Sequence, residues 1–296
     1  MMPVTPSLPQ LSPLSWLLAY FCRAALVAYA RQFSDIPYTK EVAELTDAAA
    51  TVKQFVSEGQ EQPIVVAALV EARYKTIELL RARFNGTQIL ELASGLLPRG
   101  MILSQNSELT FIESDLPGMI QRKQQLVQQL IGSRPNLHFL AINATSRPNP
   151  LPLQSGYFHP EKPVTILCEG LLMYLTKAEK QQVCANVREM LLPYGGVWIT
   201  SDFTTKAGAG QMRQSDSALG QVNQKIMSST GRTFAENEFD DLDHAKQFAL
   251  EQGFRVEAFS MLEVIDQLSC VSVLGIDLER AKPLLAATPV FALTLA

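Results

Sequence analysis

The sequence lacks the cysteine and histidine patterns that hold metals or form disulfide frameworks. Its four cysteines lie far apart in the chain and include no CxxC pair, so neither a zinc cluster nor a set of disulfides is expected. Isolated thiols are typical of a reducing cytoplasm, where we expect the protein to act. Three histidines are present, His138, His159 and His244, and no metal site is predicted from them.

The sequence also has no long basic run and no long apolar run. Its 25 Lys and Arg residues against 29 Asp and Glu residues give a net charge of −4, so we expect no nucleic-acid partner. The apolar stretch from Trp16 to Ala30 contains Arg23 and is shorter than the roughly 20 apolar residues that span a membrane. We predict a soluble helix there and no membrane partner; membrane insertion is the alternative.

The composition is that of an ordinary globular protein. Of the 296 residues 47% are hydrophobic and 18% are charged, which is enough apolar material for a core. The length allows two domains, or one α/β domain with a cap. We expect residues 1–60 to form an N-terminal arm and helical cap, and residues 61–296 to form the core. The polar stretch 204–238, which contains helix-interrupting glycines, is expected to be a lid-like or disordered insert.

Short apolar runs alternate with helical segments from Thr87 onward, which predicts an α/β fold with a doubly wound, mostly parallel sheet. Seven strands are expected, at Gln88–Leu92, Leu109–Ile112, His138–Ile142, Val164–Cys168, Val197–Thr200, Phe254–Phe259 and Val290–Leu295. Helices are expected at Thr39–Glu58, at Ile64–Phe84, at Pro117–Ile131 and from a capping box at Thr176 to Leu192.

Polar residues follow the predicted strands at the sheet edge where ligands bind in such folds. Asp115 is placed to accept the ribose hydroxyls of an adenosine; alternatively, it caps the next helix. Asn143 could meet an adenine edge or be an ordinary turn residue. Glu169 ends an apolar strand and needs partners if it is buried, either a ligand or nearby backbone N–H groups.

The turn after the first strand has small residues but no dinucleotide-binding fingerprint. The run Ala93-Ser94-Gly95 allows a ligand to approach the backbone. The motif G-x-G-x-x-G is missing, because Gly95 and Gly100 have the wrong spacing. A pyrophosphate cofactor, and with it a nicotinamide-dependent oxidoreductase, is therefore disfavoured.

Three strings in this order resemble the leucine carboxyl methyltransferase family: ELASGLLPRG from Glu91, ESDLP from Glu113 and EGLLMYL from Glu169. This family belongs to the class I S-adenosylmethionine-dependent methyltransferases and includes bacterial O-methyltransferases of polyketide and other secondary metabolism. The resemblance implies a Rossmann-like, seven-stranded sheet with an antiparallel last strand. It also implies S-adenosyl-L-methionine as the cofactor.

The resemblance implies a role for each matching residue. Ala93 and Gly95 would line the methionine part of the cofactor, and Arg73 would pair with its carboxylate. The remaining cofactor residues would be Glu91 in the first string, Asp115 with Glu113 at the ribose, Asn143 and Ala144 at the adenine, and Glu169 with Gly170 near the sulfonium. Tyr174 matches a family tyrosine near the methyl-transfer site. Ala93 replaces the family's first glycine, and Leu97 stands where Gly or Asp is common.

The predicted function is methyl transfer from S-adenosylmethionine to a carboxylate or hydroxyl of a small-molecule or protein acceptor. A carboxylate is ionised at neutral pH and needs no base, whereas a hydroxyl would need one. A catalytically idle scaffold that binds the cofactor is the alternative. Arg213 and Arg232 in the polar insert could pair with an anionic acceptor or lie on the surface. The acceptor and the oligomeric state are not predicted.

Overall fold

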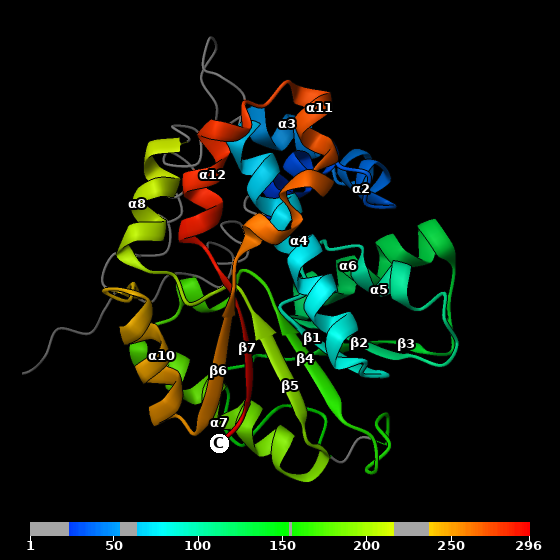
Figure 1. Ribbon diagram of the computed structural model, residues 1–296. Helices are drawn as coiled ribbons and strands as arrows, with labels where there is room; N and C mark the ends of the chain where they lie inside the picture. The colour runs from blue at the N-terminus through cyan, green and yellow to red at the C-terminus, as the bar shows by residue number, and fades with distance from the viewer. Residues whose placement is uncertain (1–23, 54–63, 154–155, 216–236) are drawn as a thin grey trace, which may run out of the picture.

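The computed structural model describes residues 24–53, 64–153, 156–215 and 237–296, and a seven-stranded sheet lies at its centre (Figure 1). The order across the sheet is β3-β2-β1-β4-β5-β7-β6. Six strands run parallel, and the last strand of the chain runs antiparallel to both of its neighbours, which confirms the predicted α/β fold. The strands are β1 (Gln88–Leu92), β2 (Thr110–Asp115), β3 (Leu137–Ala141), β4 (Val164–Cys168), β5 (Gly196–Thr200), β6 (Phe254–Phe259) and β7 (Val290–Leu295).

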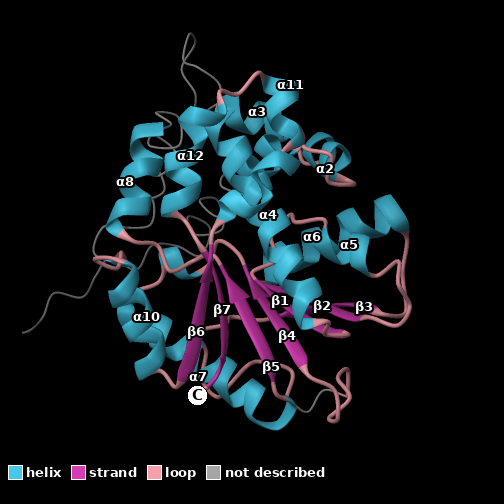
Figure 2. Cartoon of the chain, in the orientation of Figure 1, coloured by secondary structure: helices cyan, strands magenta, loops and turns pink. Residues whose placement is uncertain are grey.

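Helices cover both faces of the sheet, as Figure 2 shows. One face packs against α4 (Ile64–Phe84), α5 (Arg99–Leu103) and α6 (Pro117–Ile131); the other packs against α7 (Lys177–Tyr194) and α10 (Leu242–Glu251). The buried side chains form two main clusters, and neighbouring residues of β1 belong to different ones: Ile89 to the first and Leu90 to the second. Successive strand residues point to opposite faces, so a sheet covered on both sides needs continuous apolar strands.

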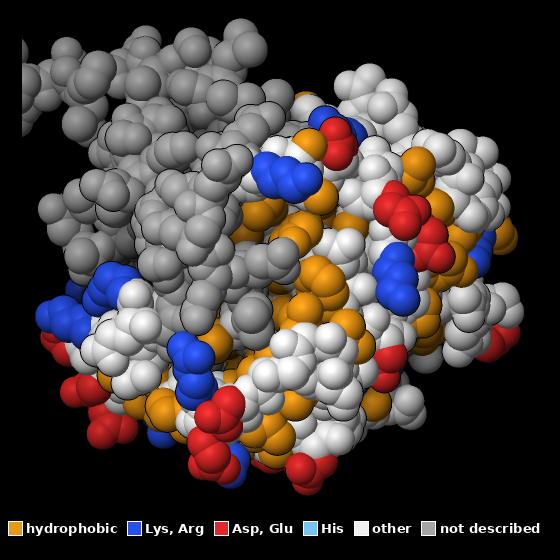
Figure 3. All heavy atoms as spheres, turned by 90° about the horizontal axis from the view of Figure 1, so that it is seen from above, with side chains coloured by type: hydrophobic (Ala, Val, Ile, Leu, Met, Phe, Trp, Pro, Cys, Tyr) orange, Lys and Arg blue, Asp and Glu red, His pale blue; other side chains and the backbone are white. Residues whose placement is uncertain are grey.

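The remaining helices gather at the carboxyl ends of the parallel strands (Figure 1). They are the helical residues 24–31, α2 (Thr39–Leu45), α3 (Ala48–Lys53), the short η1 (Leu172–Tyr174), α8 (Lys206–Ser215), η3 (Met261–Gln267), α11 (Ser269–Leu274) and α12 (Leu278–Ala287). Seen from this end, hydrophobic side chains form a band across the surface (Figure 3). None of the described helices combines the length and the apolar character needed to cross a membrane.

The predicted helix Thr39–Glu58 is two helices in the structure. Helix α2 ends at Leu45 and α3 begins at Ala48. Asp47, between them, has φ +46°, a left-handed conformation that interrupts the helical hydrogen-bond ladder. Residues 54–58 lie outside the described residues, as do residues 1–23, which include most of the helix predicted from Trp16.

The insert 204–238 contains a helix that the sequence analysis did not predict. Helix α8 includes Gly208 and Gly210, which were interpreted as helix breakers. A Cβ atom at Gly208 would lie 2.8 Å from the backbone oxygen of Ala287, so this glycine allows α8 to lie close against the end of α12. Tertiary packing therefore outweighs the low helix propensity of glycine here. Residues 216–236, with Arg232, lie outside the described residues.

Candidate active site

Two adjoining pockets open at the carboxyl edge of the sheet, and both are lined by Ala93 and Asp115. The first pocket extends toward the helical residues 24–31 and includes Arg73, Glu169, Gly170 and Tyr174. The second extends along the loop after β3 and includes Asn143 and Ala144. The structure thus brings together residues that the sequence spreads over about 100 positions. The two pockets therefore share Ala93 and Asp115 as common lining residues.

The turn after β1 has a backbone conformation that favours small residues. Ala93 has φ +53° and Gly95 has φ +50°, so this turn uses the left-handed conformation twice. That conformation is easy for glycine but costs an L-residue such as Ala93 on the order of 1 kcal/mol. Ser94, between them, lines the first pocket, and its buried Oγ has no hydrogen-bond partner within the described residues.

Asp115 lies at the end of β2 and faces both pockets. Its Oδ2 accepts a hydrogen bond from the N–H of Gly95 at 2.8 Å, and its Oδ1 accepts one from the N–H of Leu116 at 2.7 Å. Burial raises the pKa of the Asp115 carboxyl, and the two backbone donors oppose that effect. Helix α6 has no side-chain cap, so the alternative role of Asp115 as a helix cap does not hold. An ionised carboxylate has about four lone-pair positions, which leaves acceptors for a ligand.

Asn143 and Ala144 form part of the wall of the second pocket. The Oδ1 atom of Asn143 accepts hydrogen bonds from the backbone N–H and the hydroxyl of Thr145, at 3.2 and 2.8 Å. The side chain therefore also acts as the ordinary turn residue that was considered as the alternative. Both interpretations of Asn143 are compatible with its place in the structure.

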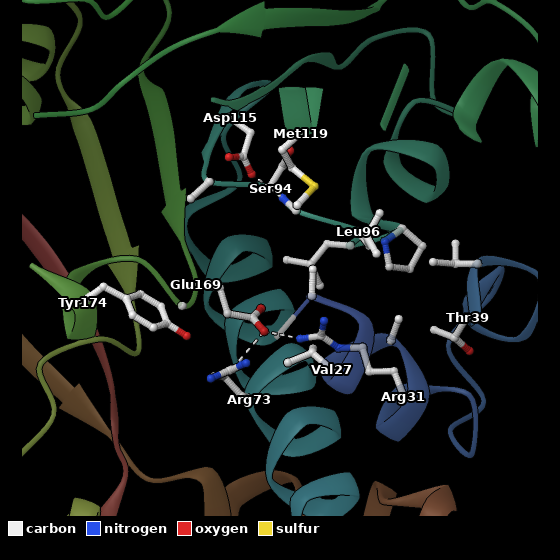
Figure 4. A pocket seen from close by; sticks show the side chains of 18 residues that line it. Val27, Arg31, Thr39, Arg73, Ser94, Leu96, Asp115, Met119, Glu169 and Tyr174 are labelled. Carbon is white, nitrogen blue, oxygen red and sulfur yellow. Dashed lines mark hydrogen bonds and ion pairs between the residues drawn. The ribbon is translucent and has the colours of Figure 1, made fainter. Parts of the chain in front are cut away.

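Glu169 follows β4 and lies in the first pocket beside the guanidinium groups of Arg31 and Arg73 (Figure 4), and the buried Arg99 is its third cationic partner. Its Oε1 accepts a hydrogen bond from Arg31 and another from Arg73 Nε at 2.9 Å, and its Oε2 accepts one from Arg99 at 3.2 Å. Burial alone would raise the pKa of this carboxyl, but the three cations outweigh burial and lower the pKa to about 2. The charge of Glu169 is thus compensated by side chains rather than by backbone N–H groups.

Glu91 and Glu113 do not line either pocket, although both were predicted as cofactor residues. Glu91 is fully buried and forms an ion pair with Arg99. Glu113 is fully buried and pairs with Lys123 at 2.6 Å. Both carboxylates point to the sheet face that α5 and α6 cover and lie outside the lining of the two pockets. Among the described residues each of the two thus pairs with a buried cation.

Arg99 links the buried Glu91 to the pocket residue Glu169, because it forms an ion pair with each of them. It is fully buried, pairs with Glu78 at 2.7 Å as well as with Glu91 and Glu169, and its Cζ lies 4.6 Å from the ring centroid of Tyr74. A buried guanidinium with three carboxylate partners and an aromatic face is held in one orientation. Arg99 was part of the resembling string, but no role was predicted for it.

Asp202 was missed by the sequence analysis and organises the loop after β4. It follows β5, and its carboxylate accepts hydrogen bonds from the N–H groups of Gly170 at 2.7 Å, Leu171 at 2.6 Å and Leu172 at 3.0 Å. Gly170 has φ +82°, and Asp202 holds this turn so that Glu169 and Tyr174 face the cavity. The signal was available, because Asp202 is another carboxylate, two residues after the end of a predicted strand.

The three histidines lie elsewhere. His138 is half-buried on β3 and packs against Tyr157 in a tilted arrangement, with 4.5 Å between ring centroids. His159 lines a different pocket together with Thr87 and Thr110, which lie at the opposite edge of the sheet. His244 is an exposed residue of α10. None of the three is among the residues that line the two pockets at the carboxyl edge.

The sheet order and the carboxyl-edge site are those of a Rossmann-like, nucleoside-binding α/β protein. A sequence model described as "Leucine carboxyl methyltransferase" matches residues 19–188, more than half of the 296 residues. The chain belongs to the leucine carboxyl methyltransferase family, which confirms the resemblance.

Relatives of known name agree with this assignment. A Mycobacterium tuberculosis protein named as an S-adenosyl-L-methionine-dependent methyltransferase is 26% identical over 171 residues, covering 57% of this chain and 54% of that protein. A Mycobacteroides abscessus protein with the same description is 32% identical over 107 residues, covering 36% of this chain and 35% of that protein. The alignments thus span about half or less of the length of these curated relatives.

A solved structure resembles the fold over nearly its whole length. The crystal structure of a DUF574 family protein from Streptomyces avermitilis covers 92% of this chain and 96% of its own, with a TM-score of 0.52 and 15% sequence identity. This likeness shows the fold.

Proposed function

We propose that this protein is an S-adenosyl-L-methionine-dependent O-methyltransferase that methylates a carboxylate or hydroxyl of a small molecule in the cytoplasm. One observation carries the proposal: the two pockets meet at Ala93 and Asp115, and Arg73 lies in the first pocket. Asp115 could accept hydrogen bonds from ribose hydroxyls, and Arg73 could pair with an amino-acid carboxylate. The turn after β1 lies with them along the lining of the two pockets.

The residues that line this path fit the cofactor. Asp115 retains lone pairs for the ribose hydroxyls, and Arg73 offers a guanidinium for the cofactor carboxylate. The buried hydroxyl of Ser94 has no hydrogen-bond partner within the described residues, which is costly unless a ligand or water satisfies it. Asn143 and Ala144 line the second pocket, where the adenine would lie.

Bound S-adenosylmethionine supplies a methyl group that is already activated by the positive sulfur. The chain then has to hold the acceptor oxygen in line with that methyl at about 3 Å and keep water out. Tyr174 points its hydroxyl into the cavity from the side opposite Arg31 (Figure 4). It is therefore suited to hydrogen-bond an acceptor and hold it in that position. Glu169 fixes Arg31 and Arg73, and Asp202 fixes the backbone that carries Glu169.

Replacing Asp115 tests the ribose position. We expect Asp115→Ala to weaken S-adenosylhomocysteine binding by about tenfold or more, because charge-assisted hydrogen bonds contribute about 1.5–3 kcal/mol. Calorimetric titration measures the change. Asp243→Ala, which removes an exposed carboxylate from α10, is the matched control and should bind as the wild type does. Unchanged affinity in Asp115→Ala would remove Asp115 from the cofactor site.

Turnover separates the enzyme from the scaffold alternative. A wild-type protein that binds S-adenosylhomocysteine and converts S-adenosylmethionine to it with a methylated acceptor is an enzyme. Binding without turnover on a library of acids, phenols and alcohols would favour the idle scaffold. This alternative rests on Ala93, which replaces the family's first glycine and has a positive φ that is unfavourable for alanine.

A further inference from the structure

Two carboxylates line the second pocket, and the proposed function uses only one of them. Asp115 lines both pockets and is assigned to the ribose. Glu179 is a half-buried residue of α7 that lines the second pocket and not the first. It therefore belongs to the part of the site where the adenine would lie, and no role has been given to it.

The other side chains of the second pocket are mostly apolar. They come from the ends of neighbouring strands and from the loop that precedes α7: Leu92, Leu116, Ile142, Ala144, Leu171 and Leu175. Apolar side chains suit the two faces of a flat aromatic base, and the few polar groups in such a pocket determine which base fits.

The side chain of Glu179 is fixed by the capping box at the start of α7. Its Oε2 accepts hydrogen bonds from the backbone N–H of Thr176 at 2.8 Å and from the Thr176 hydroxyl at 3.0 Å. The hydroxyl oxygen of Thr176 accepts one from the backbone N–H of Glu179 at 3.3 Å. An ionised carboxylate has about four lone-pair positions, so these bonds are compatible with another one from a ligand.

Helix α7 is also held against the loop that follows β3. Asn186 lies about two turns after Glu179 and therefore on the same face of the helix. Its Nδ2 donates hydrogen bonds to the backbone oxygens of Ala144 at 2.8 Å and Ser146 at 3.2 Å. The two sides of the pocket that carry Glu179 and Asn143 are thus joined by direct hydrogen bonds.

The loop after β3 already uses several of its acceptors within the chain. The Oδ1 atom of Asn143 accepts two hydrogen bonds from Thr145, which fill the two lone pairs of an amide oxygen. The backbone oxygen of Asn143 accepts one from the N–H of Ser146 at 3.0 Å, and that of Ala144 accepts the one from Asn186. The 6-amino group of adenine is a donor and needs an acceptor, which the carboxylate of Glu179 can supply.

We propose that Glu179 selects the base of the cofactor: its carboxylate accepts a hydrogen bond from the 6-amino group of adenine. This inference rests on the proposed methyltransferase function and adds to it a residue that determines specificity. A 6-oxo purine presents an oxygen at the same position, and its lone pairs repel a carboxylate. The same side chain thus attracts adenine and rejects hypoxanthine.

S-adenosylhomocysteine and S-inosylhomocysteine test this selection, because they differ only in the purine, which is adenine in one and hypoxanthine in the other. Both are titrated calorimetrically into the wild type and its variants, and the ratio of the two dissociation constants is the measured quantity. We expect the wild type to bind S-adenosylhomocysteine about tenfold more tightly or better, as a charge-assisted hydrogen bond against a repulsive contact requires.

Glu179→Gln removes the charge while the capping box, which forms with Glu or Gln, is retained. The new amide can donate to a 6-oxo group, so we expect the ratio to fall by about fivefold or more. Glu179→Ala removes donor and acceptor alike and should also lower the ratio. Glu251→Gln, which removes an exposed carboxylate from α10, is the matched control and should keep the ratio of the wild type.

The outcomes separate this inference from the proposed function. A wild type that binds both ligands equally, or a ratio that neither Glu179 variant changes, would overturn the role of Glu179. Equal weakening of both ligands leaves the ratio unchanged and would show that Glu179 only supports α7. A folded wild type that binds neither ligand would instead remove the proposed function. The melting temperature of each variant shows whether it is folded.

Discussion

At the residue scale, the site depends on buried charges that compensate one another. Glu169 is the centre of this arrangement, because Arg31, Arg73 and Arg99 all reach it. Removing one member of a buried ionic group leaves the others without compensation and typically costs about 3–5 kcal/mol. Glu169 and its three arginine partners should therefore contribute strongly to the stability of the folded protein.

Glu169→Gln tests this contribution through its pH dependence. At neutral pH we expect the variant to lose about 3 kcal/mol of unfolding free energy. The folded-state pKa is lowered from 4.5 to about 2, so the unfolded chain takes up the proton first and the stabilisation by Glu169 is lost as pH falls through this range. The difference in unfolding free energy between wild type and variant should therefore decrease from pH 4.5 toward pH 2.

Urea unfolding at a series of pH values measures this difference in unfolding free energy between the wild type and Glu169→Gln. Glu257→Gln, an exposed glutamate of β6, is the control and should follow the wild type throughout. A difference that stayed constant or increased as the pH fell would contradict the account of Glu169.

The residues that line the pockets could be predicted from the sequence more readily than the buried ion pairs around them. Asp115, Glu169 and Tyr174 could be predicted because each follows a recognisable strand or lies in a specific string. Glu91 and Glu113 were placed in the cofactor site because they belong to the same strings. Their burial with Arg99 and Lys123 depends on side-chain packing between α5, α6 and the sheet, which a sequence pattern does not report.

At the element scale, the strands were more predictable than the helices outside the sheet. Seven short runs predicted the seven strands, and the first five were continuously apolar, as burial on both faces of a sheet requires. The helix predicted from Thr39 divides at Asp47 because one residue takes a left-handed conformation. Helix α8 was missed because its glycines were interpreted by propensity alone, whereas one of them is required by contact with another element.

Two glycine substitutions in α8 test that interpretation. Gly208→Ala places a Cβ 2.8 Å from a backbone oxygen of α12, so we expect a loss of about 1–3 kcal/mol in unfolding free energy. Gly210→Ala meets nothing within 4 Å, so we expect a gain of about 0.5–1 kcal/mol from better helix propensity. Urea unfolding at neutral pH measures both values. A Gly208→Ala protein as stable as Gly210→Ala would show that α8 does not depend on close packing against α12.

At the scale of the whole molecule, the chain builds its site where the parallel strands end and where helices from both ends of the sequence gather (Figure 1). The sheet order could be expected from the alternation of strands and helices and from the family resemblance. The cavity wall could not, because helical residues 24–31 reach Glu169 over 138 positions of sequence. Arg31 carries no sequence signal of its own, and only the folded chain brings it beside Glu169.

The central claim is that the two pockets at the carboxyl edge bind S-adenosylmethionine. Calorimetric titration of the purified protein with S-adenosylhomocysteine, with NADH as the control, tests it most directly. We expect one site with a dissociation constant of roughly micromolar size, about −8 kcal/mol, and no binding of NADH. Absence of S-adenosylhomocysteine binding by correctly folded protein would contradict the account.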